Sequence, residues 1–454
     1  MPRRYSPPEG QIIQAFTFAL DPTPNQRAQI SRFFGARRKA FNWTLDQIKT
    51  DVDRYRETGE SSTPPSFYSL RKRWNAEKDT VCVNQNTGEV WWSEVSKEVF
   101  ADGVRGATDA YWRWQKSRAG KIAGRKVGFP RFKKRGKDRD RFSFSTGPMR
   151  LEADRRHLTL PVLGTLRTHE NTRRIERLIA LGRAKVLSVT VSRQGERIIA
   201  AVRVSVTRPQ QAHVAQPDSV VGIDVGVRRL ATVATTTEVI GELANPRALE
   251  HRLSELRRLQ RQRARRTRGS RQYQETAVKI IRLHAEVAHL RRHTIHVFTT
   301  NLAKTQGVLV VEGLDAASLL QQKGLPGARA RRRGLSDAAI GEIRRQLRYK
   351  CPWYGSTLVE ADRFFPSSKT CHDCGHVQVI GWREHWTCEE CSSSHQRDDN
   401  AAINLARWAG LGSVGAPVKR GAEHQTESHS AAGDDTRKGS PAPVGRNNSV
   451  RSAA

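Results

Sequence analysis

The sequence predicts a multidomain chain in which an α/β domain follows an all-α module and a small β domain. The length of 454 residues exceeds the ~100–200 residues of one ordinary domain, so several folding units are expected. Apolar residues recur at helical spacing from about 25 to 126, and short β-rich runs separated by turn residues occupy 129–208. From residue 219 onward, apolar strands alternate with long helical segments, which is typical of α/β domains.

The first half of the chain is expected to combine the helical module with the β domain. Residues 11–20 are β-rich and are followed by prolines, so residues 1–22 are expected to add a first strand to the β domain of 129–208. Residues 23–128 form the helical module, which the Ser- and Pro-rich stretch 61–66 interrupts. Within the β domain, strands are expected at 141–145, 158–160, 185–192 and 198–206, the last two joined as a hairpin.

The second half is expected to fold as an α/β domain over 218–370, after a Gln-rich linker, and to be completed by a last helix within 392–409. The arginine-rich stretch 328–334 is expected in a flexible loop before a helix capped by Ser336, and our hypothesis for this loop is a mobile lid. Residues 410–454 lack periodicity and are expected to be disordered. The other expected elements are strands at 219–226, 230–234, 308–311 and 358–359 and helices at 246–268 and 272–305.

The charge of the chain indicates a polyanionic partner. Lys and Arg number 79 against 45 Asp and Glu, a formal net charge of +34. Such an excess repels itself unless a polyanion neutralises it, so we expect nucleic acid to be bound. No apolar run approaches the ~18–20 residues of a spanning helix, and prolines follow the basic start where a secretory signal is apolar. We therefore expect no membrane association and a cytoplasmic, nucleoid-associated protein of a prokaryote.

Three acidic residues stand at the ends of expected elements. Asp224 closes one strand, Glu312 closes a second, and Asp398 opens a helix, with separations of 88 and 86 residues. In open α/β sheets, sites assemble at the carboxyl ends of strands, so the three carboxylates are expected to converge. Carboxylate oxygens suit Mg²⁺, and paired ions of this kind support phosphodiester hydrolysis. We therefore interpret Asp224, Glu312 and Asp398 as catalytic magnesium ligands of a nuclease.

Each acid also has an ordinary structural interpretation. Asp224 lies in an Asp-Val-Gly turn, Glu312 follows four buried-type residues, and Asp398 suits the first turn of a helix, where an acid complements the dipole. The nuclease interpretation therefore depends on the three occurring together in a strongly basic chain.

Four of the six cysteines form two C-x-x-C pairs, separated by 13 residues: Cys371, Cys374, Cys388 and Cys391. Two such knuckles make a closed tetrahedral Zn²⁺ site, and four thiolates leave no open position, so the expected zinc is structural. A redox pair or two disulfides are the alternatives, disfavoured in a cytoplasmic protein. Nearby histidines offer replacement ligands, which the doubled C-x-x-C makes unnecessary: His372, His376, His385 and His395.

Two basic segments are candidates for nucleic-acid contacts. One mixes cations with an aromatic residue at Phe132, and the other is an arginine-rich helix near 257–268. Cations follow phosphate backbones, and aromatic rings stack on unpaired bases. For any single arginine a solvated helix face is the alternative. The candidate residues are Arg131, Lys133, Lys134, Arg135, Arg261 and Arg265.

Four motifs resemble those of the TnpB family, transposon-encoded RNA-guided nucleases related to type V CRISPR effectors. They occur in family order, with the cysteine motif between the second and third acids. Residue 392 is serine where the family commonly has glycine. The motifs are Gly222-Ile-Asp-Val-Gly226, Val310-Val-Glu-Gly313, Phe365-Pro-Ser-Ser-Lys-Thr-Cys-His-Asp-Cys-Gly375 and Arg397-Asp-Asp-Asn-Ala-Ala-Ile-Asn-Leu405.

The resemblance implies an RNase H-like (RuvC) nuclease domain that holds Mg²⁺ on Asp224, Glu312 and Asp398, with Asp399 at a variable position. It implies an inserted zinc ribbon at 371–391, a β-barrel wedge domain and a helical recognition module. It further implies a guide RNA that pairs with double-stranded target DNA beside a short transposon-adjacent motif, and a monomer is expected. The open alternatives are a binder that does not cut, such as an RNA-guided repressor, and a DDE-type transposase.

Overall fold

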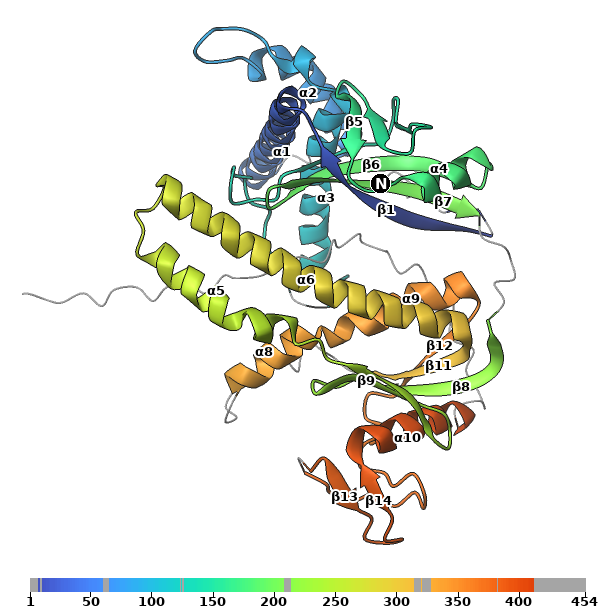
Figure 1. The fold of residues 1–454 in the computed structure, drawn as a ribbon. Helices are drawn as coiled ribbons and strands as arrows, with labels where there is room; N and C mark the ends of the chain where they lie inside the picture. The colour runs from blue at the N-terminus through green and yellow to red at the C-terminus, as the bar shows by residue number, and fades with distance from the viewer. Residues whose placement is uncertain are drawn as a thin grey trace, which may run out of the picture.

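The structure is a computed structural model that describes residues 7–8, 10–59, 65–122, 124, 126–207, 214–313, 320, 328–381 and 383–411. The described chain forms two lobes, one built from the blue to green elements up to residue 207 and one from the yellow-green to red elements from residue 216 onward (Figure 1). Across these residues, no helix is both long enough and apolar enough to cross a membrane. The expected disordered tail, apart from its first two residues, and most of the expected linker lie outside the described residues.

The N-terminal lobe contains a seven-stranded sheet in the order β2-β6-β7-β1-β5-β4-β3. The first strand pairs antiparallel with β7 from Gln11↔Thr207 to Leu20↔Ile198, so it lies beside strands that follow far later in the chain. In the described part of the chain, no strand pairing joins the two edge strands, β2 and β3. The sheet is therefore open and does not close into the expected barrel. The strands are β1 (Gln11–Asp21), β2 (Arg141–Phe144), β3 (Arg150–Leu151), β4 (His157–Leu160), β5 (Gly164–Thr168), β6 (Ala184–Gln194) and β7 (Arg197–Thr207).

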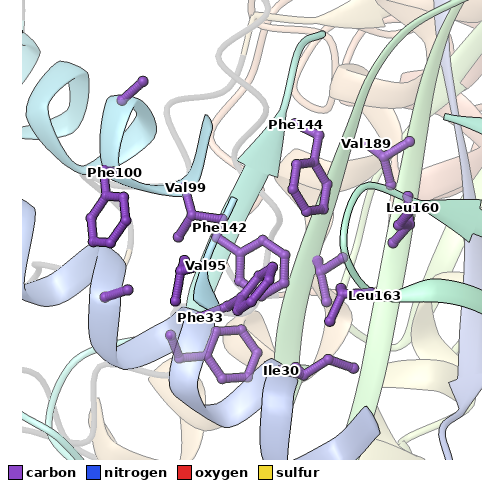
Figure 2. Close-up of a cluster of buried hydrophobic side chains, with 14 of the residues drawn as sticks. Ile30, Phe33, Val95, Val99, Phe100, Phe142, Phe144, Leu160, Leu163 and Val189 are labelled. Atoms are coloured by element: carbon purple, nitrogen blue, oxygen red, sulfur yellow. The ribbon is translucent and has the colours of Figure 1, made fainter. Parts of the chain in front are cut away.

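Helices cover one face of this sheet. The first begins with a capping box, in which Thr23 accepts from the N–H of Gln26 and the Gln26 side chain accepts from the N–H of Thr23. Phe33 of this helix packs edge-on against Phe142 of β2, with ring centroids 5.4 Å apart, in the buried cluster of Figure 2. The helices are α1 (Pro24–Thr58), α2 (Phe67–Val81), α3 (Lys97–Arg118) and α4 (Arg173–Ala180), with a short 3₁₀ turn, η1 (Trp92–Glu94).

The second lobe is built on a five-stranded sheet in the order β10-β9-β8-β11-β12. The first three strands pair antiparallel, and β11 and β12 run parallel to β8. The strands are β8 (Gln216–Asp224), β9 (Arg229–Ala234), β10 (Val239–Ala244), β11 (Gln306–Glu312) and β12 (Thr357–Ala361), and the helices are α5 (Ala248–Ala264), α6 (Arg271–Thr305), α8 (Ala328–Ala338), α9 (Ile340–Tyr354) and α10 (Arg397–Leu411).

Alternate residues of β8 bury against opposite layers. Val221 and Ile223 join a core with residues of α6 and α9, while Val220 contacts a cluster that contains Leu405 of α10. The helices α6 and α9 thus cover one face of the sheet and α10 covers the other (Figure 1). This two-sided cover explains why β8 and β11 are apolar along most of their length.

The structure corrects the expectation for the arginine-rich stretch. Within the described residues, 328–334 belongs to helix α8 and is not a loop, so it gives no support to a lid. Ser336 caps nothing, because α9 begins after Ala339 with no side-chain cap. The neighbouring Asp337 does act as a cap, but for a different helix. Its carboxylate accepts from the backbone N–H of Leu249, in the first turn of α5, at 3.0 Å.

Candidate functional site

Asp224 and Glu312 are the last residues of two strands and lie at the same edge of the second sheet. The parallel ladder between β8 and β11 pairs Ile223 with Val311, and each acid is the next residue along its strand. Both side chains therefore stand at the carboxyl ends of neighbouring parallel strands, where α/β proteins bind ligands. The predicted juxtaposition of these two acids is present in the fold.

Asp398 reaches this edge because α10 lies directly on β8. A Cβ atom at Gly222 would be 2.0 Å from the carbonyl oxygen of Ala402 and 2.4 Å from the nitrogen of Ala406, so only glycine permits the contact. The first turn of α10, which carries Asp398, then meets the end of β8. A Cβ atom at Gly226, two residues after Asp224, would lie 3.9 Å from Oδ2 of Asp398.

The three acids share one electrostatic environment. Asp224 is 9% exposed, and its burial, followed by the negative charges of Asp398 and Glu312, raises the pKa of Asp224 to about 8. Burial likewise raises the pKa of Glu312, against the opposing charge of Arg397. Removal of water and repulsion from the other two carboxylates thus disfavour the ionised form of Asp224, which a cation bound at this edge would favour.

The carboxylate oxygens do not form a closed cage. Among the described residues, the three acids do not belong to any group whose ligand atoms all lie within 4.8 Å of one another. A small cavity of about 20 Å³ adjoins Glu312 and is also lined by Val225, Ile340 and Arg344. That volume is enough for about one water-sized group. The cavity thus adjoins one of the three acids, Glu312, at the carboxyl end of β11.

An arginine that the sequence analysis missed lies between the acids. Arg229, at the start of β9, places Nη1 2.8 Å from Oδ1 of Asp399 and Nε 3.5 Å from Oδ2 of Asp398. Arg229 is thus shared between Asp399, its nearer partner, and Asp398. The only sequence signal for Arg229 was its position just after the Asp224 turn.

The four cysteines of the two C-x-x-C pairs converge. Their sulfurs all lie within 4.8 Å of one another, and Cys371–Cys391 and Cys374–Cys388 are both 3.6 Å apart. All four are free thiols, which contradicts the disulfide alternative. Tetrahedral coordination with Zn–S bonds of ~2.3 Å separates sulfurs by about 3.8 Å, so the spacing fits zinc.

The two knuckles repeat one backbone geometry. In the first, the N–H of Gly375 donates to the oxygen of Cys371 at 2.9 Å; in the second, the N–H of Ser392 donates to the oxygen of Cys388 at 3.0 Å. Gly375 and Ser392 both have positive φ, 80° and 60° respectively. The serine that departs from the family pattern therefore occupies a left-handed position that favours glycine. The knuckles are joined by β13 (His385–Thr387) and β14 (Ser394–Gln396), which pair antiparallel.

Histidine and asparagine residues that were not assigned a role connect the cysteines to α10. His395 is buried, and its Nε2 lies 3.0 Å from Sγ of Cys371, so this histidine supports a cysteine without replacing it. Asn400 and Asn404 of α10 both donate to the carbonyl oxygen of Thr370, at 2.8 and 2.7 Å. The only sequence signal for Asn400 and Asn404 was that both belong to the fourth of the resembling motifs, 397–405.

The predicted nucleic-acid-binding cations lie in two separate places. One group precedes β2 and the other lies at the end of α5, in the helical pair α5–α6 that projects from the second lobe (Figure 1). Lys133 differs from the others because its Nζ lies 3.0 Å from Asp138. The remaining five are exposed: Arg131, Lys134, Arg135, Arg261 and Arg265.

Comparison with known families gives three matches along the chain. A profile described as "Probable transposase" (OrfB_IS605) matches residues 201–323, one described as "Cas12f1-like, TNB domain" matches 341–405, and a "Helix-turn-helix domain" profile (HTH_OrfB_IS605) matches 12–59. The second match contains all four cysteines and Asp398.

Whole-length relatives agree with these matches. The Mycobacterium tuberculosis H37Rv protein "Putative RNA-guided DNA endonuclease Rv2885c" is 60% identical over 98% of both chains. The Escherichia coli K12 protein "Putative RNA-guided DNA endonuclease InsQ" is 28% identical over 87% of this chain and 91% of its own. The solved "Cryo-EM structure of the Cas12f1-sgRNA-target DNA complex" covers 88% of this chain and 99% of its own at 14% identity and a TM-score of 0.45, which is too weak a likeness to carry an assignment. On the strength of the sequence relatives, this chain belongs to the TnpB family of transposon-associated proteins.

Proposed function

We propose that this protein is an RNA-guided DNA endonuclease of a transposable element, which cleaves target DNA by metal-dependent phosphodiester hydrolysis. The observation that carries the proposal is the convergence of Asp224, Glu312 and Asp398 at one sheet edge, where burial, and then the charges of the other two acids, raise the pKa of Asp224. The names of the full-length relatives support the same activity. The five-stranded sheet, with three antiparallel and two parallel strands, is taken as the RNase H-like core.

The carboxylates suit magnesium in their chemistry. All three side chains offer oxygen donors, and a bound cation would favour the ionised form of Asp224, which burial and the charges of Asp398 and Glu312 disfavour. The three carboxylates are proposed to hold the Mg²⁺ ions of a phosphodiester hydrolase. When bound, such ions supply an activated water and stabilise the leaving oxygen of the phosphodiester. Asp224 is the innermost ligand in this assignment, and Arg229 holds the first turn of α10 in place.

The Cys₄ cluster is assigned to structural zinc. Its closed ligand set leaves no position for a substrate, and β13 and β14 are only three residues long, so the segment has little core of its own. Metal analysis of the purified chain should find zinc near one equivalent. Chelation should lower the unfolding temperature, and unchanged stability after complete zinc removal would contradict this role.

The proposed partners are a guide RNA and duplex target DNA. In this assignment base pairing selects the sequence, while the protein holds the heteroduplex and reads a short adjacent motif. The N-terminal lobe is assigned as recognition and wedge regions, and the exposed arginines of α5 and of 131–135 as phosphate contacts. The proposed assembly contains one copy of the protein.

The experiment is cleavage of a plasmid that carries a matched target, by protein co-purified with guide RNA in the presence of Mg²⁺. Asp224→Asn and Glu312→Gln should each abolish detectable cleavage while RNA binding is retained. Asp218→Asn is the matched control, because Asp218 is an exposed acid at the opposite end of the same strand. Cleavage by Asp224→Asn at the control rate would overturn the proposal and favour a protein that binds without cutting.

A further inference from the structure

A cleft in the N-terminal lobe lies on elements that carry none of the three carboxylates. Its volume is about 550 Å³, within the ~300–1,000 Å³ typical of ligand sites. It is formed by the middle of α1, the end of α2 with the residues after it, and the segment before β2. The residues used in the argument below are Lys39, Trp43, Asp46, Thr80, Gln85 and Phe132.

Two aromatic rings line this cleft, Phe132 and Trp43; the backbone beside the first and the ring of the second are both fixed by neighbouring groups. Phe132 is 41% exposed, yet its neighbour Lys133 is clamped by Asn42, which donates to the Lys133 oxygen at 3.0 Å and accepts from its N–H at 2.7 Å. Trp43 donates from Nε1 to Glu77 at 3.2 Å and packs edge-on against buried Trp74 at 5.2 Å. Little free energy is therefore needed to order the Trp43 ring, or the backbone that carries Phe132, when a ligand stacks there.

Cations surround the rings. Lys39 is exposed and has no ion-pair partner among the described residues, and Nζ of Lys49 lies 5.5 Å from the centroid of Phe132. Arg131 and Lys134, on either side of the Phe132–Lys133 pair, are also exposed. Positive charge beside exposed aromatic rings is how proteins bind single-stranded nucleic acid, with phosphates on the cations and bases on the rings.

Polar groups inside the cleft suit the edge of a base. Asp46 offers carboxylate acceptors and Gln85 an amide, while Thr80 offers a hydroxyl oxygen as an acceptor, because its hydrogen is donated to the carbonyl oxygen of Glu77 at 2.8 Å; all three residues are exposed. Such groups pair with the donors and acceptors of bases. A base within a duplex is stacked on both faces and cannot enter, so the occupant must be unpaired.

We propose that this cleft binds an unpaired nucleobase of a single-stranded RNA or DNA segment, stacked against Phe132 and Trp43, with Lys39 and Lys49 near the adjoining phosphates. The inference rests on the proposed function only in that the protein binds nucleic acid; it does not depend on cleavage. The shared chemistry is an aromatic base on a charged strand, and RNA and DNA are its two sources.

The test compares affinities of the full-length chain for four fluorescent probes of equal length: single-stranded U-rich RNA, single-stranded T-rich DNA, and the two corresponding duplexes. High salt weakens phosphate contacts and exposes the stacking contribution. Phe132→Leu should weaken binding of a single-stranded probe about 5- to 150-fold, the range for one stacked base, with duplex binding unchanged. Tyr68→Leu is the matched control, because Tyr68 is a 68% exposed ring on α2 outside the cleft.

The outcomes separate the two sources. If Phe132→Leu loses affinity for the single-stranded RNA alone, the cleft binds RNA; if it loses affinity for the single-stranded DNA alone, the cleft binds DNA. A loss of affinity for both probes means that the cleft takes a base from either RNA or DNA. Equal affinities of Phe132→Leu and Tyr68→Leu for both single strands, or a parallel loss on the duplexes, would overturn the proposal. A second measurement uses the unaltered chain, in which photocross-linking to 5-iodouridine or 5-iodo-deoxyuridine probes should label Phe132 or Trp43. Labelling confined to other segments would contradict the site, whatever the cleavage activity of the protein.

Discussion

Asn400, in the first turns of helix α10, accepts a hydrogen bond from the backbone N–H of His372 at 3.0 Å. Its side-chain nitrogen donates to the carbonyl oxygens of Ser367 and Thr370. Because Asn400 follows Asp398 by two residues, one short stretch of helix carries both a proposed magnesium ligand and the anchor of the first cysteine knuckle. The cysteine cluster and the acidic site are therefore mechanically joined through α10.

Asn400→Ala should destabilise the cysteine-rich segment more than Asn404→Ala does. Both asparagines donate to the same two carbonyl oxygens, so each substitution leaves those oxygens with one donor. Only Asn400→Ala also leaves the His372 N–H without its acceptor, which costs about 1–3 kcal/mol. Urea unfolding of the zinc-loaded variants measures the difference. Equal losses in the two variants would show that the His372 contact contributes nothing.

Gly222→Ala should be strongly destabilising, by about 3 kcal/mol or more, because its Cβ would lie 2.0 Å from a backbone oxygen of α10. The helix must move away from β8, which displaces Asp398, so cleavage should fall with stability. Gly241→Ala on β10 is the control, since a Cβ there meets no atom within 4 Å. Thermal unfolding and plasmid cleavage of both variants check this, and a well-folded, active Gly222→Ala protein would refute the close packing.

Ser392→Gly should stabilise the protein. Serine at φ 60° pays the cost of the left-handed conformation, about 1 kcal/mol, which glycine avoids. The first knuckle allows the reverse substitution. Gly375→Ser should destabilise the protein by a similar amount, because Gly375 has φ 80° and a Cβ atom there meets no other atom within 4 Å, so that only the backbone conformation is disfavoured. The concentration of chelator that releases half of the zinc reports both effects. A shift in the same direction for both variants would rule out backbone strain as the cause.

Lys350 should make stability depend on alkaline pH. This residue of α9 is 1% exposed, and burial lowers its pKa from 10.5 to about 8, although Nζ donates to the oxygens of His296, Thr299 and Gln346. Between these two pKa values the unfolded chain binds more protons than the folded chain, so stability should rise with pH across pH 8 to 10.5. The rise approaches about 3 kcal/mol at its upper limit.

The measurement for Lys350 is the difference in unfolding free energy between the unaltered chain and Lys350→Met over that pH range. Methionine fills a similar volume without a titrating group, so the rise should disappear from the variant. Because cysteines and tyrosines titrate in the same range in both proteins, only the difference reports Lys350. Parallel pH profiles would mean that the buried ammonium keeps its ordinary pKa.

Regular elements were predictable where local pattern and burial agree. The apolar runs that became β8 and β11, and the periodic stretches that became α5 and α6, were recognised because a two-sided core demands such patterns. The strand β10 was missed, since all but one of its residues are exposed and it carries no alternation. The helix α8 was missed because its arginine-rich sequence lacks an apolar stripe, and its position depends on neighbours such as α5.

The sequence predicted which acids and cysteines form the candidate site, but not the residues that hold them in position. Acids at strand ends and doubled C-x-x-C pairs are signals contained in a few adjacent residues. The roles of Arg229, Asp337 and His395 depend on partners 24 to 170 residues away, such as Asp399, Leu249 and Cys371. Local sequence contains no information on such partners.

Net charge and ligand chemistry depend on which side chains are present and how they are spaced, so the amino-acid sequence alone was enough to predict a zinc-type cysteine cluster, three acidic site residues and a polyanionic partner. Folding decided which of the acids is deeply buried, how far apart their oxygens lie, and which two aromatic rings line one cleft. The reason is physical: desolvation and Coulomb energies depend on distances in space, and these distances are set by packing such as that of α10 on Gly222.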